Sequence, residues 1–222
     1  MRNISVPKQE MLLVRLKNNF MKAELQQQIF AKYPKMFGDR TKPMTETCMC
    51  WGLEVGDGWY NIIDTLCEAL TNTYTTSVEI DEEDGKRLGI EPYKFEGKDS
   101  YYFSVEPPQV IATQVKEKYG TLRFYYREEY DEKFMSLYQT GKYPDLQRNI
   151  DRYSDYINGI VHFAETASGR TCDETGQPGE LHVSGGTRNG WVKTVNKEHA
   201  KTALADHNYV PFSEIPKDEN CN

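Results

Sequence analysis

The chain has 222 residues, enough for one domain or for one domain with a small appendage. Hydrophobic residues make up 38% of it, and its 15 Tyr, 9 Phe and 3 Trp supply bulky core material, which argues against a wholly disordered chain. The five cysteines are an odd number, and no apolar run approaches the roughly 20 residues of a membrane span. We therefore expect a folded protein of the cytoplasm with reduced thiols and no membrane partner.

Charge is distributed unevenly along the chain. Residues 1–43 contain nine basic and three acidic residues, whereas residues 44–150 contain 11 and 20, and the whole chain has a net charge of −7. This asymmetry predicts either that the basic segment packs on the acidic body of its own chain or that it meets an acidic partner. Its surplus of positive charge is modest for a nucleic-acid-binding segment, so we do not expect a nucleic-acid partner.

Hydrophobic periodicity predicts two helices in the first third of the chain. Within residues 8–33, five apolar side chains lie close to one helical face: Leu13, Leu16, Phe20, Leu25 and Ile29. That face can pack on the domain or form the seam of a homo-oligomer. Residues 58–72 contain a full apolar stripe that includes Cys67, and Asp57 stands where a helix-capping residue is expected.

Strands are predicted in the middle of the chain. Residues 81–100 are charged and contain three glycines and a proline, which indicates a solvated insertion. Residues 100–106 are typical of a strand. Residues 109–117 and 121–127 predict a hairpin around Gly120, whose second arm alternates apolar with basic or aromatic side chains.

Helices return in the last part of the chain. We expect a short helix over 131–140, a long one over 145–168 and, after a glycine-rich stretch, another short one near 197–206. This order predicts an α+β fold, with helices packed on a small antiparallel sheet and a small loop-rich, ribbon-like module at the C-terminal end.

Three parts follow from this arrangement. They are a basic N-terminal helix and linker over 1–43, an α+β core over 44–168, and a ribbon-like module and tail over 169–222. In the last part, Cys172 and His199 stand at the outer positions of a zinc-ribbon pattern. Thr175 and Asn196 stand at the two inner positions, and both are poor zinc ligands, so we expect no cofactor and keep zinc as the alternative.

Three stretches resemble an uncharacterised protein family found in phages, prophages and bacteria. They are residues 51–59 with the helix that follows, the hairpin over 114–125, and the module over 172–199. The resemblance implies a phage or prophage origin, and it implies a Cys-x-x-Cys pair and a Cys-x-x-His pair of ligands in the last module. This chain departs from that ligand set at Thr175 and Asn196.

The predicted hairpin offers a candidate ligand site. Alternation places Arg123, Tyr125 and Arg127 on one face of a strand, with Lys116 on the opposite arm. Guanidinium groups suit phosphate and an aromatic ring suits a base, so this face predicts a nucleotide site with Trp59 or Trp191 as a stacking wall. The competing interpretation is a solvated face whose basic residues pair with nearby glutamates: Glu117, Glu128 and Glu129.

Catalytic motifs do not stand out in the sequence. It contains no Gly-x-Ser-x-Gly elbow, Walker loop or His-Glu-x-x-His pattern. We therefore expect a non-enzymatic, phage-encoded binding protein that counters host antiviral defence by sequestering a nucleotide signal. One alternative is an inhibitor that binds a host defence or nucleic-acid enzyme through an acidic surface. Another is a metal-dependent nuclease or hydrolase that uses the acidic cluster at 81–84 or at 128–132.

Overall fold

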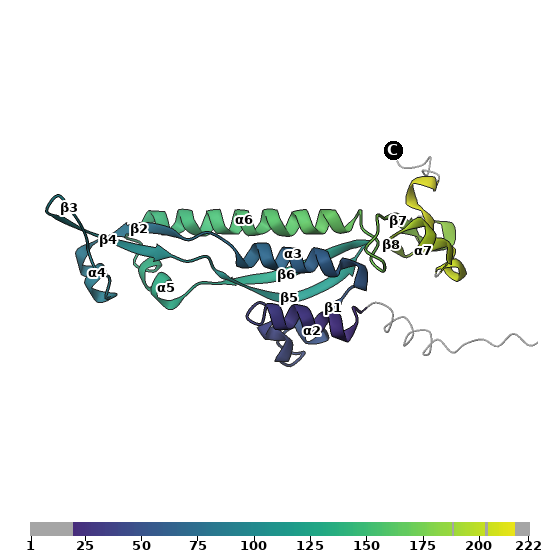
Figure 1. Cartoon of the computed structure of the whole chain (residues 1–222), viewed down its shortest axis with the longest axis horizontal. Helices are drawn as coiled ribbons and strands as arrows, with labels where there is room; N and C mark the ends of the chain where they lie inside the picture. The colour runs from purple at the N-terminus through teal and green to yellow at the C-terminus, as the bar shows by residue number, and fades with distance from the viewer. Residues whose placement is uncertain (1–19, 188, 203, 216–222) are drawn as a thin grey trace, which may run out of the picture.

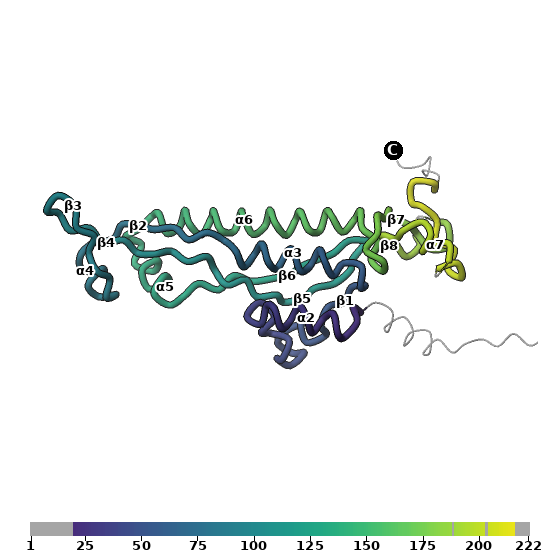
Figure 2. Tube along the Cα trace, viewed as in Figure 1, coloured from purple at the N-terminus to yellow at the C-terminus, as the bar shows by residue number. Residues whose placement is uncertain are grey.

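The computed structural model describes residues 20–187, 189–202 and 204–215. Helix α6 (Pro144–Ser168) has 25 residues, is about 37 Å long at 1.5 Å per residue, and runs along an elongated molecule (Figure 1). A first sheet lies beneath its middle, a second sheet lies at one end, and the C-terminal module lies at the other end, as the chain trace in Figure 2 also shows.

The N-terminal part of the described chain packs on the domain itself. Helix α2 (Ala23–Lys32) buries Ile29 and Phe30 in the main hydrophobic core. After it, the carbonyl oxygen of Met36 accepts a hydrogen bond of 2.8 Å from the N–H of Ala112 in the first sheet. The described part of segment 1–43 is thus integrated with the core, whereas Leu13 and Leu16 lie outside the described residues.

Helix α3 (Tyr60–Thr71) confirms the predicted apolar stripe. Its buried side chains are Ile63, Leu66, Cys67 and Leu70. The prediction for Asp57 was wrong, because its side chain does not cap this helix. Asp57 Oδ1 instead accepts a 2.8 Å hydrogen bond from the N–H of Lys22, the residue that precedes α2, so Asp57 ties two helices together.

The first sheet contains the predicted hairpin. Strand β5 (Gln109–Lys118) pairs antiparallel with β6 (Thr121–Glu129), and β1 (Leu53–Glu54) lies parallel to β5 on its other side. Helix α6 covers the edge of β6, where Ser168 Oγ accepts the N–H of Leu122 at 2.8 Å and Glu165 accepts that of Phe124 at 3.1 Å. These side chains occupy N–H groups that an uncovered edge strand would offer to another chain.

A second sheet forms around the strand predicted over residues 100–106 and extends into the predicted solvated insertion. Strand β4 (Lys98–Val105) lies between β2 (Thr76–Ile80) and β3 (Tyr93–Phe95), and all pairs are antiparallel. Helix α4 (Glu82–Arg87) connects β2 to β3 and buries Asp84. Most residues of 81–100 are exposed, as the prediction of a solvated insertion expects, but α4, β3 and the start of β4 give the segment regular structure that the prediction lacked.

Side chains alternate along the second sheet as a half-buried sheet requires. Val78, Ile80, Phe103 and Val105 belong to the main core, whereas the intervening residues are exposed. The hydroxyl of Tyr153 on α6 donates a 2.9 Å hydrogen bond to the carbonyl oxygen of Val105. Helix α6 therefore covers both sheets with one continuous core.

The C-terminal module is small and has its own sheet. Strand β7 (Glu180–Val183) lies between β8 (Val192–Val195) and β9 (Val210–Pro211), and α7 (Lys197–Thr202) follows β8. With α5 (Glu132–Tyr138) and the helices above, the elements confirm the predicted α+β class. None of the helices that the structure describes combines the length and the apolar character needed to cross a membrane.

Candidate functional site

The structure brings three of the predicted nucleotide-binding residues together on the first sheet. Lys116 on β5 and Arg123 on β6 are cross-strand partners, and Tyr125 follows on the same face. Lys116 Nζ lies 5.5 Å from the ring centroid of Tyr125, a cation–π contact on an exposed surface. Arg123 also lies 3.6 Å from Glu165 on α6, so part of its charge is balanced within the chain.

Arg127 serves a different purpose from the one predicted. Its guanidinium group donates two hydrogen bonds to the buried carboxylate of Asp39 and two more to Glu129. The hydrogen bonds from Arg127 lower the pKa of Asp39 below its ordinary value, although burial opposes this. Arg127 therefore ties the segment after α2 to β6 and has little charge left for a ligand, which corrects its assignment to the nucleotide site.

Trp59 cannot form a stacking wall. Its side chain is fully buried, and its Nε1–H donates a 2.8 Å hydrogen bond to the carbonyl oxygen of Thr171. The prediction for Trp59 was wrong because the residue lies where α3 begins, against the C-terminal module. Trp191 is 63% exposed and lies in that module, directly before β8.

The glycine-rich stretch over 56–59 binds the C-terminal module. The N–H of Gly56 donates to Asp173 Oδ1 at 2.7 Å, and the N–H of Gly58 donates to the carbonyl oxygen of Asp173 at 2.7 Å. A Cβ on Gly58 would lie 2.2 Å from the carbonyl oxygen of Cys172. The two glycines are thus needed for the close approach of two backbone segments.

The turn of the β5–β6 hairpin contacts the same module. Thr194 Oγ1 donates a buried 2.6 Å hydrogen bond to the carbonyl oxygen of Gly120. Gly120 has a φ of +77°, and a Cβ on it would lie 2.3 Å from Leu181 Cδ1. The three stretches that carry the family resemblance therefore meet in one place, which we call the junction: residues 56–59, 117–120, 171–176 and 193–194.

Thr175 and Asn196, which stand where a zinc ribbon has metal ligands, form hydrogen bonds within the C-terminal module. Thr175 Oγ1 accepts the N–H two residues further on at 3.3 Å. Asn196 donates to the carbonyl oxygen of Pro178 at 3.1 Å and accepts the N–H two residues further on at 2.9 Å. Cys172 is buried and His199 half-buried, and no trio of Cys, His, Asp or Glu side chains within the described ranges is arranged to hold a metal ion.

Buried charges lie at the junction. Lys193 Nζ lies 2.8 Å from Glu174 Oε1 and 3.5 Å from Asp173 Oδ2, and both Lys193 and Asp173 are buried. Burial raises the pKa of Asp173 above its ordinary value, although Lys193 and the N–H of Gly56 oppose this. Burial alone would lower the pKa of Lys193, but the two carboxylates outweigh it and raise that pKa. Burial likewise raises the pKa of Glu117 in the adjacent hairpin.

Lys193→Met should be strongly destabilising near neutral pH. The variant keeps the aliphatic chain but leaves two carboxylates without their ammonium partner, which we expect to lower the free energy of unfolding by about 3–5 kcal/mol. Loss of Lys193 raises the pKa of Asp173 further, so the folded state binds a proton more readily than the unfolded state. The stability of the variant should therefore increase as the pH falls from about 7 to about 5.

Urea unfolding across this pH range measures both effects. The double variant Asp173→Asn with Lys193→Met removes one of the two carboxylates and should recover part of the lost stability at about pH 7. A loss below about 1 kcal/mol in Lys193→Met, or one that does not depend on pH, contradicts the assignment of these residues as a buried ionic cluster.

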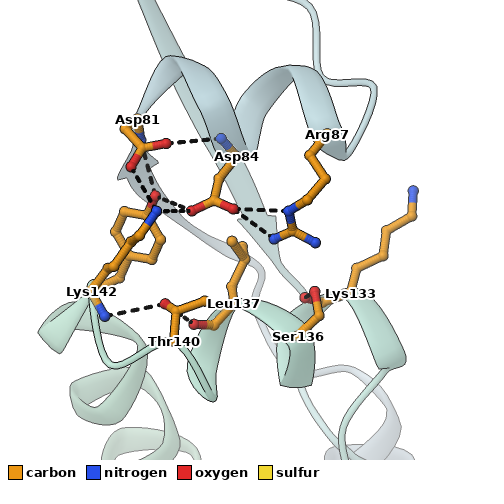
Figure 3. Close-up of polar contacts among 9 residues, drawn as sticks. Asp81, Asp84, Arg87, Lys133, Ser136, Leu137, Thr140 and Lys142 are labelled. Atoms are coloured by element: carbon orange, nitrogen blue, oxygen red, sulfur yellow. Dashed lines mark hydrogen bonds and ion pairs between the residues drawn. The ribbon is translucent and has the colours of Figure 1, made fainter.

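A second ionic cluster fixes α4 at the opposite end of the molecule. Figure 3 shows the carboxylate of Asp84 between Arg87 of α4 and the loop that joins α5 to α6. Arg87 donates to Asp84 Oδ1 from Nε at 2.9 Å and from Nη2 at 2.7 Å. The hydroxyl of Tyr143 donates to Oδ2 at 2.7 Å, and Lys142 Nζ lies 3.2 Å from the same oxygen. We call these four residues the Asp84 clamp.

The hydrogen bonds of the Asp84 clamp also set its protonation. Those from Tyr143 and Arg87 lower the pKa of Asp84 to about 2, although burial opposes this. Burial, together with the hydrogen bond to Asp84, raises the pKa of Tyr143 to about 12. The clamp therefore stays ionised throughout the neutral range and acts as a structural tie between α4 and the α5–α6 loop.

Both acidic clusters predicted as metal sites are engaged within the chain. In cluster 81–84, Asp81 accepts the N–H of Asp84 at 2.8 Å and caps α4, and Asp84 belongs to the clamp. In cluster 128–132, Glu128 accepts hydrogen bonds of 3.0 and 3.1 Å from Ser154 on α6. These contacts give Asp81, Asp84 and Glu128 structural roles, whereas Glu132 of the second cluster is exposed.

A groove of about 650 Å³ lies beside β4, near the Asp84 clamp. We call it the distal groove. Its lining residues come from the segment after α4, from β4 and its end, and from the start of α5: Ile90, Tyr102, Phe103, Ser104, Glu106, Asp131, Glu132 and Lys133. Three of these side chains carry carboxylates and one carries an ammonium, whereas most of the surface that lines the groove is apolar.

The edge of β4 faces this groove without a neighbouring strand. β2 pairs with β4 from Tyr101 to Val105, whereas β3 pairs with it from Lys98 to Ser100 and ends there. Pro92 precedes β3 and has no N–H to extend the ladder. In the part of the chain that the structure describes, β4 therefore has no strand partner beyond Ser100 on the β3 side.

Exposed aromatic rings continue the surface from the groove. Tyr93 and Phe95 on β3 are each 60% exposed, and Tyr102 on β4 is 46% exposed. The rings of Tyr93 and Tyr102 have centroids 6.4 Å apart with their planes tilted at 74°, an edge-to-face contact. Tyr102 lines the groove and contacts Tyr93, so the aromatic and acidic parts form one surface.

Sequence reasoning missed the distal groove because residues 81–100 were interpreted as an insertion. Two signals in the sequence pointed to order there. Val78 and Ile80 alternate with polar residues as in a half-buried strand, and Asp81 precedes a charged run as an N-cap residue does. No pattern in the sequence indicated the open edge of β4, because that edge depends on where the pairing between β3 and β4 ends.

Comparisons with known proteins identified no relative of this chain. No family model, no curated protein and no solved structure matches the chain. The resemblance to a family of phages, prophages and bacteria therefore stays a prediction, and the structure assigns the three stretches that carry it to the junction.

Proposed function

We propose that this chain is a non-enzymatic binding protein that docks on a basic partner protein through the distal groove. The observation that carries the proposal is an open strand edge that lies beside exposed aromatic rings and carboxylates. Two of the three carboxylates, Glu106 and Asp131, accept hydrogen bonds within the chain, which holds them at the groove. Aromatic rings beside carboxylates suit lysine and arginine side chains.

The charge of this end of the molecule supports a basic partner. Residues 76–106 contain nine acidic and four basic residues. Long-range attraction between opposite charges accelerates encounter and weakens with salt. The phage or prophage origin that the resemblance implies adds the expectation that the partner is a host protein. A host defence or nucleic-acid enzyme bound through an acidic surface is the interaction-inhibitor alternative stated above.

Binding of an alternating Lys-Val heptapeptide tests the proposal. We expect measurable affinity at about 50 mM salt and a loss of at least about tenfold at about 500 mM. The variant Glu106→Gln with Glu132→Gln should weaken binding by about tenfold. Its matched control, Glu180→Gln with Glu198→Gln, makes the same change in net charge in the C-terminal module and should bind as the unmodified protein does. Equal affinity of the two variants contradicts docking in the distal groove.

A nucleotide ligand on the first sheet is the second candidate function. The contact between Lys116 and Tyr125, with Arg123 as the cross-strand neighbour of Lys116, favours it. Lys116→Ala with Arg123→Ala should then abolish nucleotide binding, while Arg127→Ala should lower stability by about 1–2 kcal/mol and leave that binding intact. Calorimetric titration with a set of mono- and dinucleotides measures this, and unchanged binding in the double variant rejects the candidate.

A further inference from the structure

We infer that the distal groove receives an extended, Lys- or Arg-rich segment of the partner, which pairs with the open edge of β4 as an added strand. This inference rests on the proposed function and specifies its mode. It is carried by three features that meet in the groove: an unpaired strand edge, carboxylates held in place, and exposed tyrosines.

The strand edge supplies the main-chain part of such a complex. β4 is paired with β2 from Tyr101 to Val105, so this part of its backbone is already held in the extended conformation that a new strand requires. On the other side, β3 diverges after Ser100, and the groove occupies the space beside Tyr102, Phe103 and Ser104. An extended segment entering there can exchange hydrogen bonds with a preformed edge.

The carboxylates select the charge of the added strand. Glu106 is oriented by two hydroxyl donors, Ser104 Oγ at 3.1 Å and Thr75 Oγ1 at 3.0 Å. Glu132, exposed at the start of α5, faces the groove from the opposite wall. Carboxylates on both walls favour a cationic segment and repel an acidic one, so the surface discriminates by charge as well as by pairing.

The tyrosines fit the alternation of an added strand. Side chains on one face of a strand recur every second residue, at a spacing of about 7 Å. Tyr102 and Tyr93 lie at comparable separation, with ring centroids 6.4 Å apart. Alternate Lys or Arg side chains of the added strand can therefore lie over successive rings, where a cation is attracted by the aromatic face.

The Asp84 clamp fixes the two walls of the groove relative to each other. One wall includes Ile90, three residues after the end of α4, and the other wall is the start of α5. Asp84 connects α4 to Lys142 and Tyr143 in the loop that follows α5. The groove is therefore preorganised, and binding does not have to order its walls.

Backbone methylation of the probe tests strand addition separately from charge. Three versions of the Lys-Val heptapeptide are compared by fluorescence titration on the full chain: one unmodified, one methylated at the lysine nitrogens of the backbone, and one methylated at the valine nitrogens. In an added strand, the N–H groups of alternate residues face the edge. We therefore expect one methylated peptide to lose at least about tenfold in affinity and the other to bind within about threefold of the unmodified peptide.

The outcomes separate the two proposals. Three equal affinities, or equal losses for both methylated peptides, overturn strand addition and leave docking in the acidic groove in place, provided that the Glu106→Gln with Glu132→Gln variant still weakens binding. Failure of the unmodified peptide to bind overturns the proposed function itself. An alternating Glu-Val heptapeptide is the charge control, and binding equal to that of the Lys-Val peptide overturns selection for a basic segment.

Discussion

Gly58→Ala should release the C-terminal module from the core and lower the free energy of unfolding by about 3 kcal/mol or more. The added methyl group would lie 2.2 Å from the carbonyl oxygen of Cys172 and 2.4 Å from the amide nitrogen of Gly176. Both are backbone atoms, so no side chain can rotate away to make room. The two segments must separate, and the hydrogen bond from the N–H of Gly58 to Asp173 must break with them.

Urea unfolding followed by tryptophan fluorescence, together with limited proteolysis of the module, measures this effect. Trp59 reports directly, because its Nε1–H bonds to Thr171 at the start of the module. Gly159→Ala is the matched control, since its Cβ meets no atom within 4 Å and alanine favours the helix, so that variant should gain about 0.5–1 kcal/mol. A Gly58→Ala variant as stable as the unmodified chain contradicts the description of the junction.

Asp84→Asn should lower the free energy of unfolding by about 2–3 kcal/mol near neutral pH. Asparagine has the shape of aspartate but lacks its charge, so the ionic contacts of Arg87 and Lys142 weaken. Arg87 and Lys142 are partly exposed and can be solvated, which limits the loss. The same variant should weaken binding of the Lys-Val peptide, because the walls of the distal groove lose their tie.

The pH dependence of stability checks the same residue independently. The pKa of Asp84 is about 2 in the folded chain against an ordinary value of 3.8. Its ionised form therefore stabilises the fold above pH 3.8, and this contribution is lost as the pH falls toward 2. Asp84→Asn should flatten that part of the acid-unfolding profile, whereas Asp99→Asn, on the exposed start of β4, should leave it unchanged. An unchanged profile in Asp84→Asn contradicts the clamp.

Local patterns in the sequence predicted the elements whose burial follows a single period. The stripe of α3, the hairpin β5–β6 and the long helix α6 were all predicted close to their observed bounds, because each buries one regular face. The α+β class followed from their order. Strands β1 and β9 have two residues each, so periodicity could not reveal them.

The candidate site was harder to predict because its residues are selected by tertiary contacts. Alternation correctly placed Arg123 and Tyr125 on one face, and the register of the hairpin brings Lys116 opposite Arg123. Alternation could not show that Arg127 forms an ion pair with Asp39, which lies 88 residues earlier in the chain. It also could not show that Trp59 is buried and hydrogen-bonded to the C-terminal module. The distal groove depends on where β3 leaves β4, and no local pattern encodes that point.

Amide chemical-shift mapping with the Lys-Val heptapeptide is the most direct test of docking in the distal groove. Isotope-labelled protein is titrated with the peptide, and the amides that move are assigned. We expect shifts concentrated at Tyr102, Phe103 and Ser104 on β4 and at Glu132 and Lys133 on α5. Shifts that cluster instead around Lys116 and Arg123, or no shifts at peptide concentrations that saturate binding, would contradict docking in the distal groove.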